Sequence, residues 1–213
     1  MKPAHEPNKG WAYSDTNYLL LGYLIETIEK KDYYELLKAK LLSPYKLRKT
    51  APSNKRKLAN IAMAYSKLPP SFHIPHEVIS AKGKYPFNPQ MEWTGGGVYS
   101  TTGDLARWGN IYFTGNVFSE GLRSQMVKVN PNGEKVYGKK HSYGMGSFIY
   151  NTKQGVAYGH SGFMPGYMSI VAYYPALKLT AALQINCDYA TRKMQLTDYL
   201  DAIIDSFKGE SKK

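Results

Sequence analysis

Cysteine, acidic side chains and long apolar runs are all scarce in this chain of 213 residues. The single cysteine, Cys187, excludes an internal disulfide and any cysteine-rich zinc site. No apolar run approaches the roughly 18 residues that a membrane-spanning helix needs, so we expect no transmembrane segment. Residues 1–10 contain no apolar stretch of the kind found in a signal peptide, so we expect none in this chain. These absences leave the compartment of the protein unknown.

The scarcity of acidic residues makes the chain strongly basic. It carries 28 lysines and arginines against 16 aspartates and glutamates, a net charge of +12. Ten of the basic residues lie between Lys30 and Lys57, where only Asp32 and Glu35 oppose them. Such a region can bind an anionic partner, or it can be an ordinary solvated face. Because no nucleic-acid-binding motif accompanies the charge, we expect no nucleic-acid partner.

The remaining composition is typical of a globular chain, with 43% hydrophobic and 21% charged residues. Tyrosine is unusually common, with 19 residues beside 7 phenylalanines and 3 tryptophans. A tyrosine ring can be buried while its hydroxyl finds a polar partner. The excess of tyrosine therefore suits a broad, partly wet cleft.

Apolar spacing predicts both helices and strands. Helices are expected at residues 16–31, 32–42, 105–112, 120–127 and 191–207, and strands at 143–150, 155–160, 167–174 and 179–186. The links between the later strands are short enough to require antiparallel neighbours. This order indicates an α/β (α+β) fold, with an antiparallel sheet flanked by helices beside a helical and loop region. We expect residues 1–135 to form the helical and loop region, and residues 136–213 the strands and final helix of the same domain.

Two local motifs suggest a cofactor or a metal, but each lacks a required residue. The segment Gly133-x4-Gly138-Lys139-Lys140 resembles a phosphate-binding loop, yet it has lysine where serine or threonine would bind Mg²⁺. The pair His73 and His76 has no third ligand at a suitable spacing. We therefore expect neither a cofactor nor a metal ion.

Three other patterns occur in order along the chain. Residues 13–18 read YSDTNY and directly precede the leucine-rich helix, residues 95–107 read GGGVYSTTGDLAR, and residues 158–167 read YGHSGFMPGY. Each pattern alone has an ordinary structural explanation, because a tyrosine before a helix is usually a core residue and His-Ser-Gly is usually a turn. Their joint occurrence at these spacings is far more specific.

Together these patterns resemble the serine β-lactamase family, and in particular its class C β-lactamases, D-alanyl-D-alanine carboxypeptidases and related esterases. Tyr13-Ser14-Asp15 is similar to the family's Tyr-x-Asn motif, and residues 44–50 (PYKLRKT) to its Pro-Leu-Gly-Met-x-x-Thr stretch. Residues 95–107 resemble its Gly-Gly-x-x-Ser-Thr-x-x-Asp-Leu segment. His160-Ser161-Gly162 resembles the Lys-Thr-Gly box in its His-x-Gly form. The resemblance extends from about Gly10 to the C-terminal helix.

The resemblance implies a β-lactamase/transpeptidase-like fold and acyl-enzyme hydrolysis of an ester, amide or D-amino peptide. The expected substrate is a small molecule or a peptidoglycan-like compound, and the family places the protein in the periplasm or outside the cell. Acyl transfer needs a nucleophile, a base and an oxyanion hole.

The roles that the resemblance implies fall on two segments. Tyr13 would be the general base and Asp15 would orient the site lysine, while His160 would polarise the site. Ser161, Gly162 and Phe163 would form the substrate-binding wall, with the N–H of Phe163 facing the oxyanion. Gly162 would let the substrate lie flat on the strand.

The family's Ser-x-x-Lys nucleophile motif is missing upstream of Tyr13. The chain's only Ser-x-x-Lys, Ser43 to Lys46, lies downstream and inside the segment similar to Pro-Leu-Gly-Met-x-x-Thr, so we interpret it as a coincidence. We therefore expect that the N-terminal part of the fold, including the nucleophile helix, is absent and that this chain alone is inactive. We also expect self-association through an unpaired sheet edge.

Asp15 is a second departure, since the family usually has asparagine there. An amide can donate a hydrogen bond to a substrate carbonyl, whereas a carboxylate only accepts. This difference disfavours true β-lactamase activity and leaves esterase or D-amino peptidase chemistry. The alternative hypothesis is a non-catalytic module of the same fold whose basic surface binds an anionic wall polymer or lipid.

Overall fold

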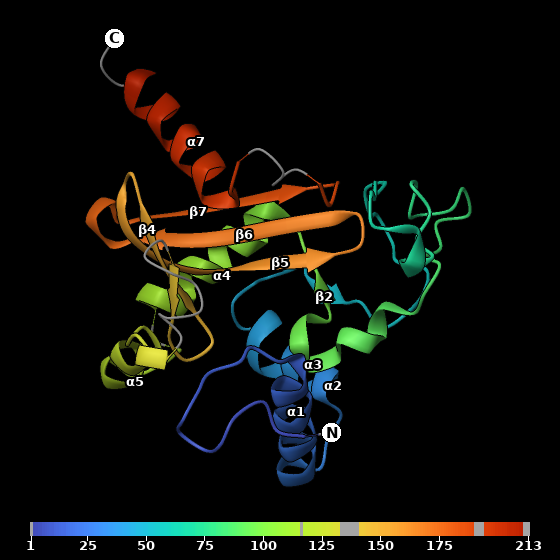
Figure 1. The fold of residues 1–213 in the computed structure, drawn as a ribbon, viewed down its shortest axis with the longest axis horizontal. Coiled ribbons are helices and arrows are strands. Elements are labelled where there is room, and N and C mark those ends of the chain that lie inside the picture. The colour runs from blue at the N-terminus through green and yellow to red at the C-terminus, as the bar shows by residue number, and fades with distance from the viewer. Residues whose placement is uncertain (1, 116, 133–140, 190–193, 211–213) are drawn as a thin grey trace.

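The computed structural model describes residues 2–115, 117–132, 141–189 and 194–210. Its centre is an antiparallel sheet of five strands in the order β3-β4-β5-β6-β7 (Figure 1). The strands are β3 (His141–Tyr143), β4 (Phe148–Thr152), β5 (Gly155–Met164), β6 (Tyr167–Tyr174) and β7 (Leu179–Ile185). The expected antiparallel sheet is thus confirmed.

Short turns hold these strands in register. Only Pro165 and Gly166 separate β5 from β6, where Met164 pairs with Tyr167. Gly166 has a φ of +85°, in the left-handed region that favours glycine, and an added Cβ would lie 2.6 Å from the Cβ of Ala64. The turn therefore needs glycine for both its backbone angle and its close packing.

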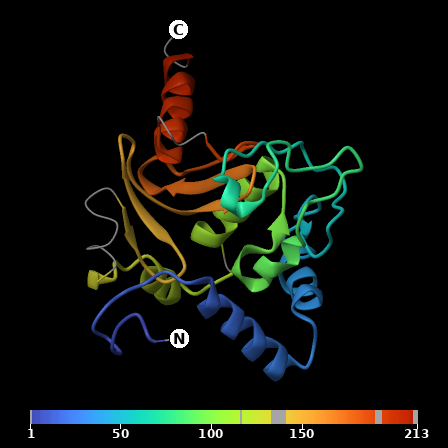
Figure 2. The ribbon, with the colours of Figure 1, turned by 45° about the vertical axis from the view of Figure 1, so that its right-hand side comes forward.

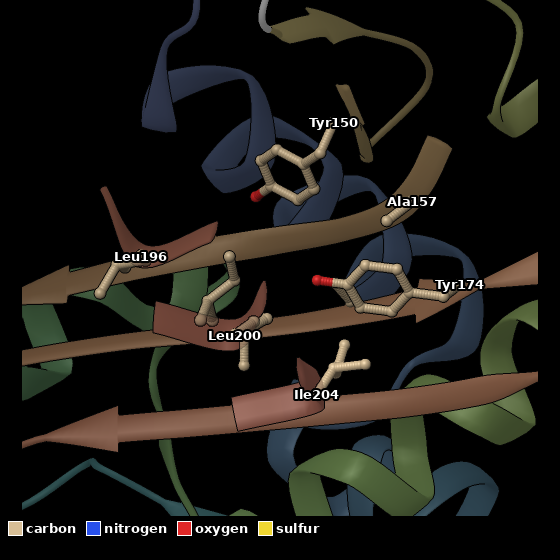
Figure 3. Packing of buried hydrophobic residues seen from close by; sticks show 8 residues of the cluster. Tyr150, Ala157, Tyr174, Leu196, Leu200 and Ile204 are labelled. Carbon is tan, nitrogen blue, oxygen red and sulfur yellow. The ribbon is translucent and has the colours of Figure 1, made fainter. Parts of the chain in front are cut away.

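The two faces of the sheet are covered by different helices. Helix α7 (Leu196–Glu210) packs on one face, where Tyr150, Ala157 and Tyr174 form a cluster with its side chains Leu196, Leu200 and Ile204 (Figure 3). Helix α4 (Thr102–Thr114) packs on the other face, against β6 and β7. An added Cβ at Gly109 of α4 would lie 2.5 Å from Val171, so this glycine permits the close approach. The helix-flanked sheet agrees with the sequence prediction.

The N-terminal helices lie beside the sheet (Figures 1 and 2). They are α1 (Asp15–Glu29), α2 (Tyr33–Leu37), its π-helical continuation η1 (Lys38–Leu42), and α3 (Trp93–Gly96). Helix α1 packs on α3 through Gly22, whose added Cβ would lie 2.5 Å from Thr94. A two-stranded sheet pairs β1 (Ala51–Pro52), which follows η1, with β2 (Val98–Tyr99), which follows α3. A short helix, α5 (Glu120–Met126), precedes the main sheet.

A long loop connects β1 to α3 and contains only the short helical turns η2 (Pro70–Phe72) and η3 (Pro89–Glu92). Its own small core is formed by apolar side chains that include Ala64, Val78 and Tyr85. This core gives the segment a fixed shape despite its few regular elements.

One strand prediction was wrong. The expected strand at residues 143–150 is two strands, β3 and β4, because the chain reverses between them. The Gly144 N–H donates to the Ser147 carbonyl, and Gly146 adopts a φ of +69°. The short spacing of glycines in this segment favoured a turn, which outweighed its apolar character.

The helix expected at 191–207 begins at Leu196, and residues 190–193 lie outside the described residues. The proposed division between residues 135 and 136 also falls outside them. No helix within the described part of the chain has the length and apolar character to cross a bilayer.

Candidate active site

Two of the sequence patterns meet at the junction of α1 and the sheet. Tyr13 lies two residues before α1, and its ring centroid lies 6.1 Å from that of His160 on β5. The ring of Tyr143, on β3, lies 5.8 Å from that of Tyr13. The structure therefore brings Tyr13 and His160 together, within reach of one small substrate.

A chain of hydrogen bonds fixes the imidazole of His160. Its Nδ1 lies 2.6 Å from the carbonyl oxygen of Ser161, which can only accept, so Nδ1 carries the proton. The Tyr143 hydroxyl lies 2.9 Å from Nε2 and therefore donates to it. The Tyr18 hydroxyl, 3.0 Å from that of Tyr143, donates in turn. Three side chains from α1, β3 and β5 thus form one directed network.

The environment of His160 favours this neutral form. Burial lowers the pKa of His160, while its backbone hydrogen bond to Ser161 and the charge of Asp15 raise it by less. The imidazole is thus neutral at pH 7, with one nitrogen donating and the other accepting. In this state it can polarise a bound group without carrying a full charge.

Asp15 brings the remaining pattern to the site. It is the first residue of α1, and its side chain lies close enough to Gly95 that an added Cβ there would be 3.6 Å from the Asp15 Cβ. Burial raises the pKa of Glu92, and the Asp15 carboxylate raises it further. Asp15 therefore acts electrostatically on both His160 and Glu92, at the meeting point of all three patterns.

The end of β5 presents an open backbone edge. Strand β4 pairs with β5 only from Gly155 to Gly159, whereas β6 pairs with it as far as Met164. Within the described residues, positions 160–164 therefore have a neighbouring strand on one side only. An open edge offers unpaired N–H and C=O groups to a ligand. Strand β5 as a whole lies inside the sheet, between β4 and β6. Its free edge is therefore confined to residues 160–164.

The wall residues lie along this open stretch. Gly162 pairs with Ser169, and an added Cβ at Gly162 would lie 2.6 Å from the Ser169 Oγ, so the Ser169 hydroxyl would have to turn away to admit a larger residue. Phe163 is 54% exposed, and Ser161 is half-buried. Because side chains alternate along a strand, His160 and Gly162 share one face while Ser161 and Phe163 share the other.

A cavity of about 430 Å³ adjoins Tyr13 and Tyr143. Its wall is largely aromatic and includes Trp11, Tyr18, Tyr112 and Phe118. No lysine or arginine of the described chain lines it. The cavity therefore supplies shape and apolar surface next to the network, but no cation.

Sequence reasoning did not single out Tyr18 and Tyr143 as site residues. Tyr18 lies inside the first of the three sequence patterns and Tyr143 lies in none of them, and nothing in their spacing distinguishes them from core tyrosines. The signal that pointed to them was compositional, namely the excess of tyrosine. Ser43, in contrast, is exposed at the end of η1 and does not line the cavity, as expected for a coincidental motif.

No group of three or more histidine, cysteine, aspartate or glutamate side chains in the described residues is placed to bind a metal ion. The groups that the described residues bring together beside Tyr13 and His160 are phenol, imidazole, carboxylate and backbone groups. These groups can move a proton and donate hydrogen bonds to a developing oxyanion.

Comparison with known proteins gives matches over nearly the whole chain. The family model described as Beta-lactamase matches residues 1–206. Over 209 residues the chain is 27% identical to penicillin-binding protein 4* of Bacillus subtilis (strain 168), covering 93% of this chain and 43% of that protein.

Two solved structures share the fold. D-amino acid amidase from Ochrobactrum anthropi SV3, complexed with L-phenylalanine amide, matches with a TM-score of 0.78 at 20% identity, over 97% of this chain and 60% of that one. D-stereospecific amidohydrolase from Streptomyces sp. matches with a TM-score of 0.73 at 22% identity, over 89% and 54%. The expected fold is thus confirmed, and the chain spans about half the length of these relatives.

Proposed function

Because this chain belongs to the Beta-lactamase family, we propose that it forms the base side and one wall of a serine-hydrolase site. The proposed reaction is hydrolysis of an ester or amide of a D-amino acid or peptidoglycan-like peptide through an acyl-enzyme. The observation that supports it most is the distance of 6.1 Å between the Tyr13 and His160 rings, beside the open edge of β5. The D-amino acid amidase and the D-stereospecific amidohydrolase that share the fold support a D-amino acid substrate.

In this proposal Tyr13 accepts the proton of a serine hydroxyl as that oxygen attacks the substrate carbonyl. The backbone N–H of Phe163 stabilises the resulting oxyanion. Collapse of the tetrahedral intermediate expels the alcohol or amine, which takes the proton back from Tyr13. Water then hydrolyses the acyl-enzyme by the same proton transfers in reverse order.

A phenol with a pKa near 10 needs a neighbouring cation to act as a base at neutral pH. The aromatic cavity beside Tyr13 has no lysine or arginine in its described lining. We therefore propose that both the serine and the cation come from a Ser-x-x-Lys segment outside these 213 residues. In this proposal Asp15 pairs with that lysine.

The surface of α1 is suited to receive such a segment. Five of its large apolar residues are more than half exposed: Leu20, Leu21, Tyr23, Leu24 and Ile28. Leu21 also lines the aromatic cavity, so the apolar surface is continuous with the site. Several exposed apolar side chains on one helix are typical of an interaction surface. We propose that a nucleophile-bearing helix covers it.

The test is covalent labelling with a fluorophosphonate and with a fluorescent penicillin. The 213-residue chain should take up neither label, whereas the same chain extended by the residues encoded upstream should label at the serine of a Ser-x-x-Lys motif. Tyr13→Phe in the extended chain should slow labelling by at least about a hundredfold, the usual effect of losing a general base. Labelling of the short chain at Ser43 would contradict the proposal.

A further inference from the structure

A second cavity, of about 360 Å³, lies away from the aromatic one and is strongly basic. Its walls are Lys46, Arg48, Lys49, Asp104 and Arg107. The first three come from the turn after η1, and the last two from the N-terminal half of α4. Two segments about 55 positions apart in the sequence thus contribute four cationic side chains to one cavity.

None of these four cations forms an ion pair with a carboxylate in the described residues, whereas Lys40 and Glu29 elsewhere in the basic region do. Within the part of the chain that the structure describes, the only side-chain hydrogen bond from the four is that of Arg107, whose Nη1 donates to the Lys46 carbonyl oxygen at 3.5 Å. Their charges are therefore available to a ligand. Mutual repulsion of like charges at such a site is relieved when an anion binds.

Asp104 offsets only one of the four positive charges of the cavity, and neutral donors hold one of its carboxylate oxygens. Its Oδ2 accepts a hydrogen bond from the Lys49 N–H at 2.7 Å and from the Thr50 hydroxyl at 3.1 Å. The residue is only 8% exposed. Its structural effect is to fix the basic turn against α4. Four cations thus remain against one largely buried carboxylate.

The backbone of the turn is held in place before any ligand binds. The Leu47 N–H donates to the Leu42 carbonyl at 2.9 Å, and the Leu47 side chain is buried. Lys46 has a φ of +57°, in the left-handed region that is unfavourable for a side-chain-bearing residue. Glycine would suit this backbone angle better, but the lysine at position 46 adds a cation to the lining of the cavity. A preorganised site loses less entropy when it binds.

We propose that this cavity binds the phosphate group of a phosphate ester. Two guanidinium and two ammonium groups match phosphate because its oxygens accept several charge-assisted hydrogen bonds at once, and arginine can bind it through paired N–H donors. The cavity has room for part of the esterified alcohol beside the phosphate. The inference rests on the charges and geometry of this cavity, and is independent of the proposed hydrolase function.

The direct test is titration of inorganic phosphate into the 213-residue chain at fixed ionic strength, followed by calorimetry. The variant Arg48→Gln/Arg107→Gln should bind phosphate at least about tenfold more weakly, since it loses two charged donors. The matched control Lys31→Gln/Lys55→Gln removes the same charge from exposed positions of the same basic region. It should bind within about twofold of the wild type, because salt screens distant charges.

Circular dichroism of both double variants checks that they are folded. A second cavity variant is Lys46→Gly, which removes one cation of the cavity at a backbone position that favours glycine. Absence of phosphate binding by the wild type, or equal weakening in both double variants, would overturn the proposal.

Two further ligands distinguish the source of the phosphate: glycerol 3-phosphate, and phosphatidylglycerol vesicles measured against phosphatidylcholine vesicles. Tighter binding of the anionic vesicles, lost in Arg48→Gln/Arg107→Gln, supports the proposal with a lipid headgroup as the source. Tighter binding of glycerol 3-phosphate, lost in the same variant, supports it with a soluble ester.

Discussion

The Tyr143 hydroxyl donates to Nε2 of His160 across 2.9 Å and thereby fixes which imidazole nitrogen is an acceptor. The two residues come from β3 and β5, on either side of β4. Their contact links the edge of the sheet to the position next to Tyr13. Several properties of the site depend on this single hydrogen bond.

Removal of the Tyr143 hydroxyl should destabilise the fold. Tyr143→Phe leaves Nε2 of His160 without its donor and the Tyr18 hydroxyl without its acceptor, in a largely buried environment. The loss should lower the free energy of unfolding by about 1–3 kcal/mol, measured by urea denaturation. The control Tyr23→Phe, on an exposed helix face, should change it by less than about 0.5 kcal/mol. Equal effects of the two variants would exclude a special role for the network.

The stability of the protein should fall in mildly acidic solution because of His160. Its folded pKa is lowered by burial from the ordinary value of 6.5, so the unfolded chain binds a proton more readily than the folded one. The stability is thus fully present above pH 6.5 and is lost as the pH falls through the folded pKa of His160. The melting temperature of the wild type should therefore decrease over this range more than that of His160→Gln. An NMR titration that gave His160 a pKa above 6.5 would contradict this expectation.

Replacing either of two lysines that have left-handed backbone angles by glycine should change stability alike but phosphate binding differently. Lys30 and Lys46 have φ angles of +53° and +57°, so glycine at either position should stabilise the fold by about 1 kcal/mol. Lys46 lines the basic cavity and Lys30 does not. Lys46→Gly should therefore weaken phosphate binding, whereas Lys30→Gly should not. Phosphate affinity that fell equally in both variants would show a general charge effect.

Self-association should occur through the free edge of β7, since no described strand pairs with its outer side. A lysine on an edge strand opposes such pairing, so Leu179→Lys should shift the sedimentation profile towards the monomer. Leu20→Gln/Ile28→Gln tests the exposed face of α1 instead and should leave the association unchanged. The opposite pattern would assign the interface to α1.

The sheet and most of its helices could be predicted because apolar spacing reports directly on which residues face the core. For example, Ile170, Ala172 and Tyr174 alternate along β6 and all face α7. The turn that separates β3 from β4 could not be predicted from that spacing, since it depends on the backbone angle of Gly146. In this segment the glycines favoured a turn, whereas the spacing of the apolar residues favoured one continuous strand.

The meeting of Tyr13, Asp15 and His160 followed from the family resemblance rather than from spacing. The hydrogen-bond partners of His160 did not follow from either, because a tyrosine hydroxyl shows its partner only in three dimensions. The same holds for the basic cavity: the charge between Lys30 and Lys57 was visible in the sequence, whereas the participation of Arg107 depends on how α4 packs.

The unequal lengths of β4 and β5 determine how much backbone a substrate can reach. Because the chain reverses at Gly146, β4 begins opposite Gly159 and leaves residues 160–164 uncovered on that side. A hairpin only a few residues longer would extend β4 along this stretch and occupy the same N–H and C=O groups. Access to the strand is thus controlled by the position of one tight turn, and insertions there would cover the open edge of β5 without altering any of the side chains along it.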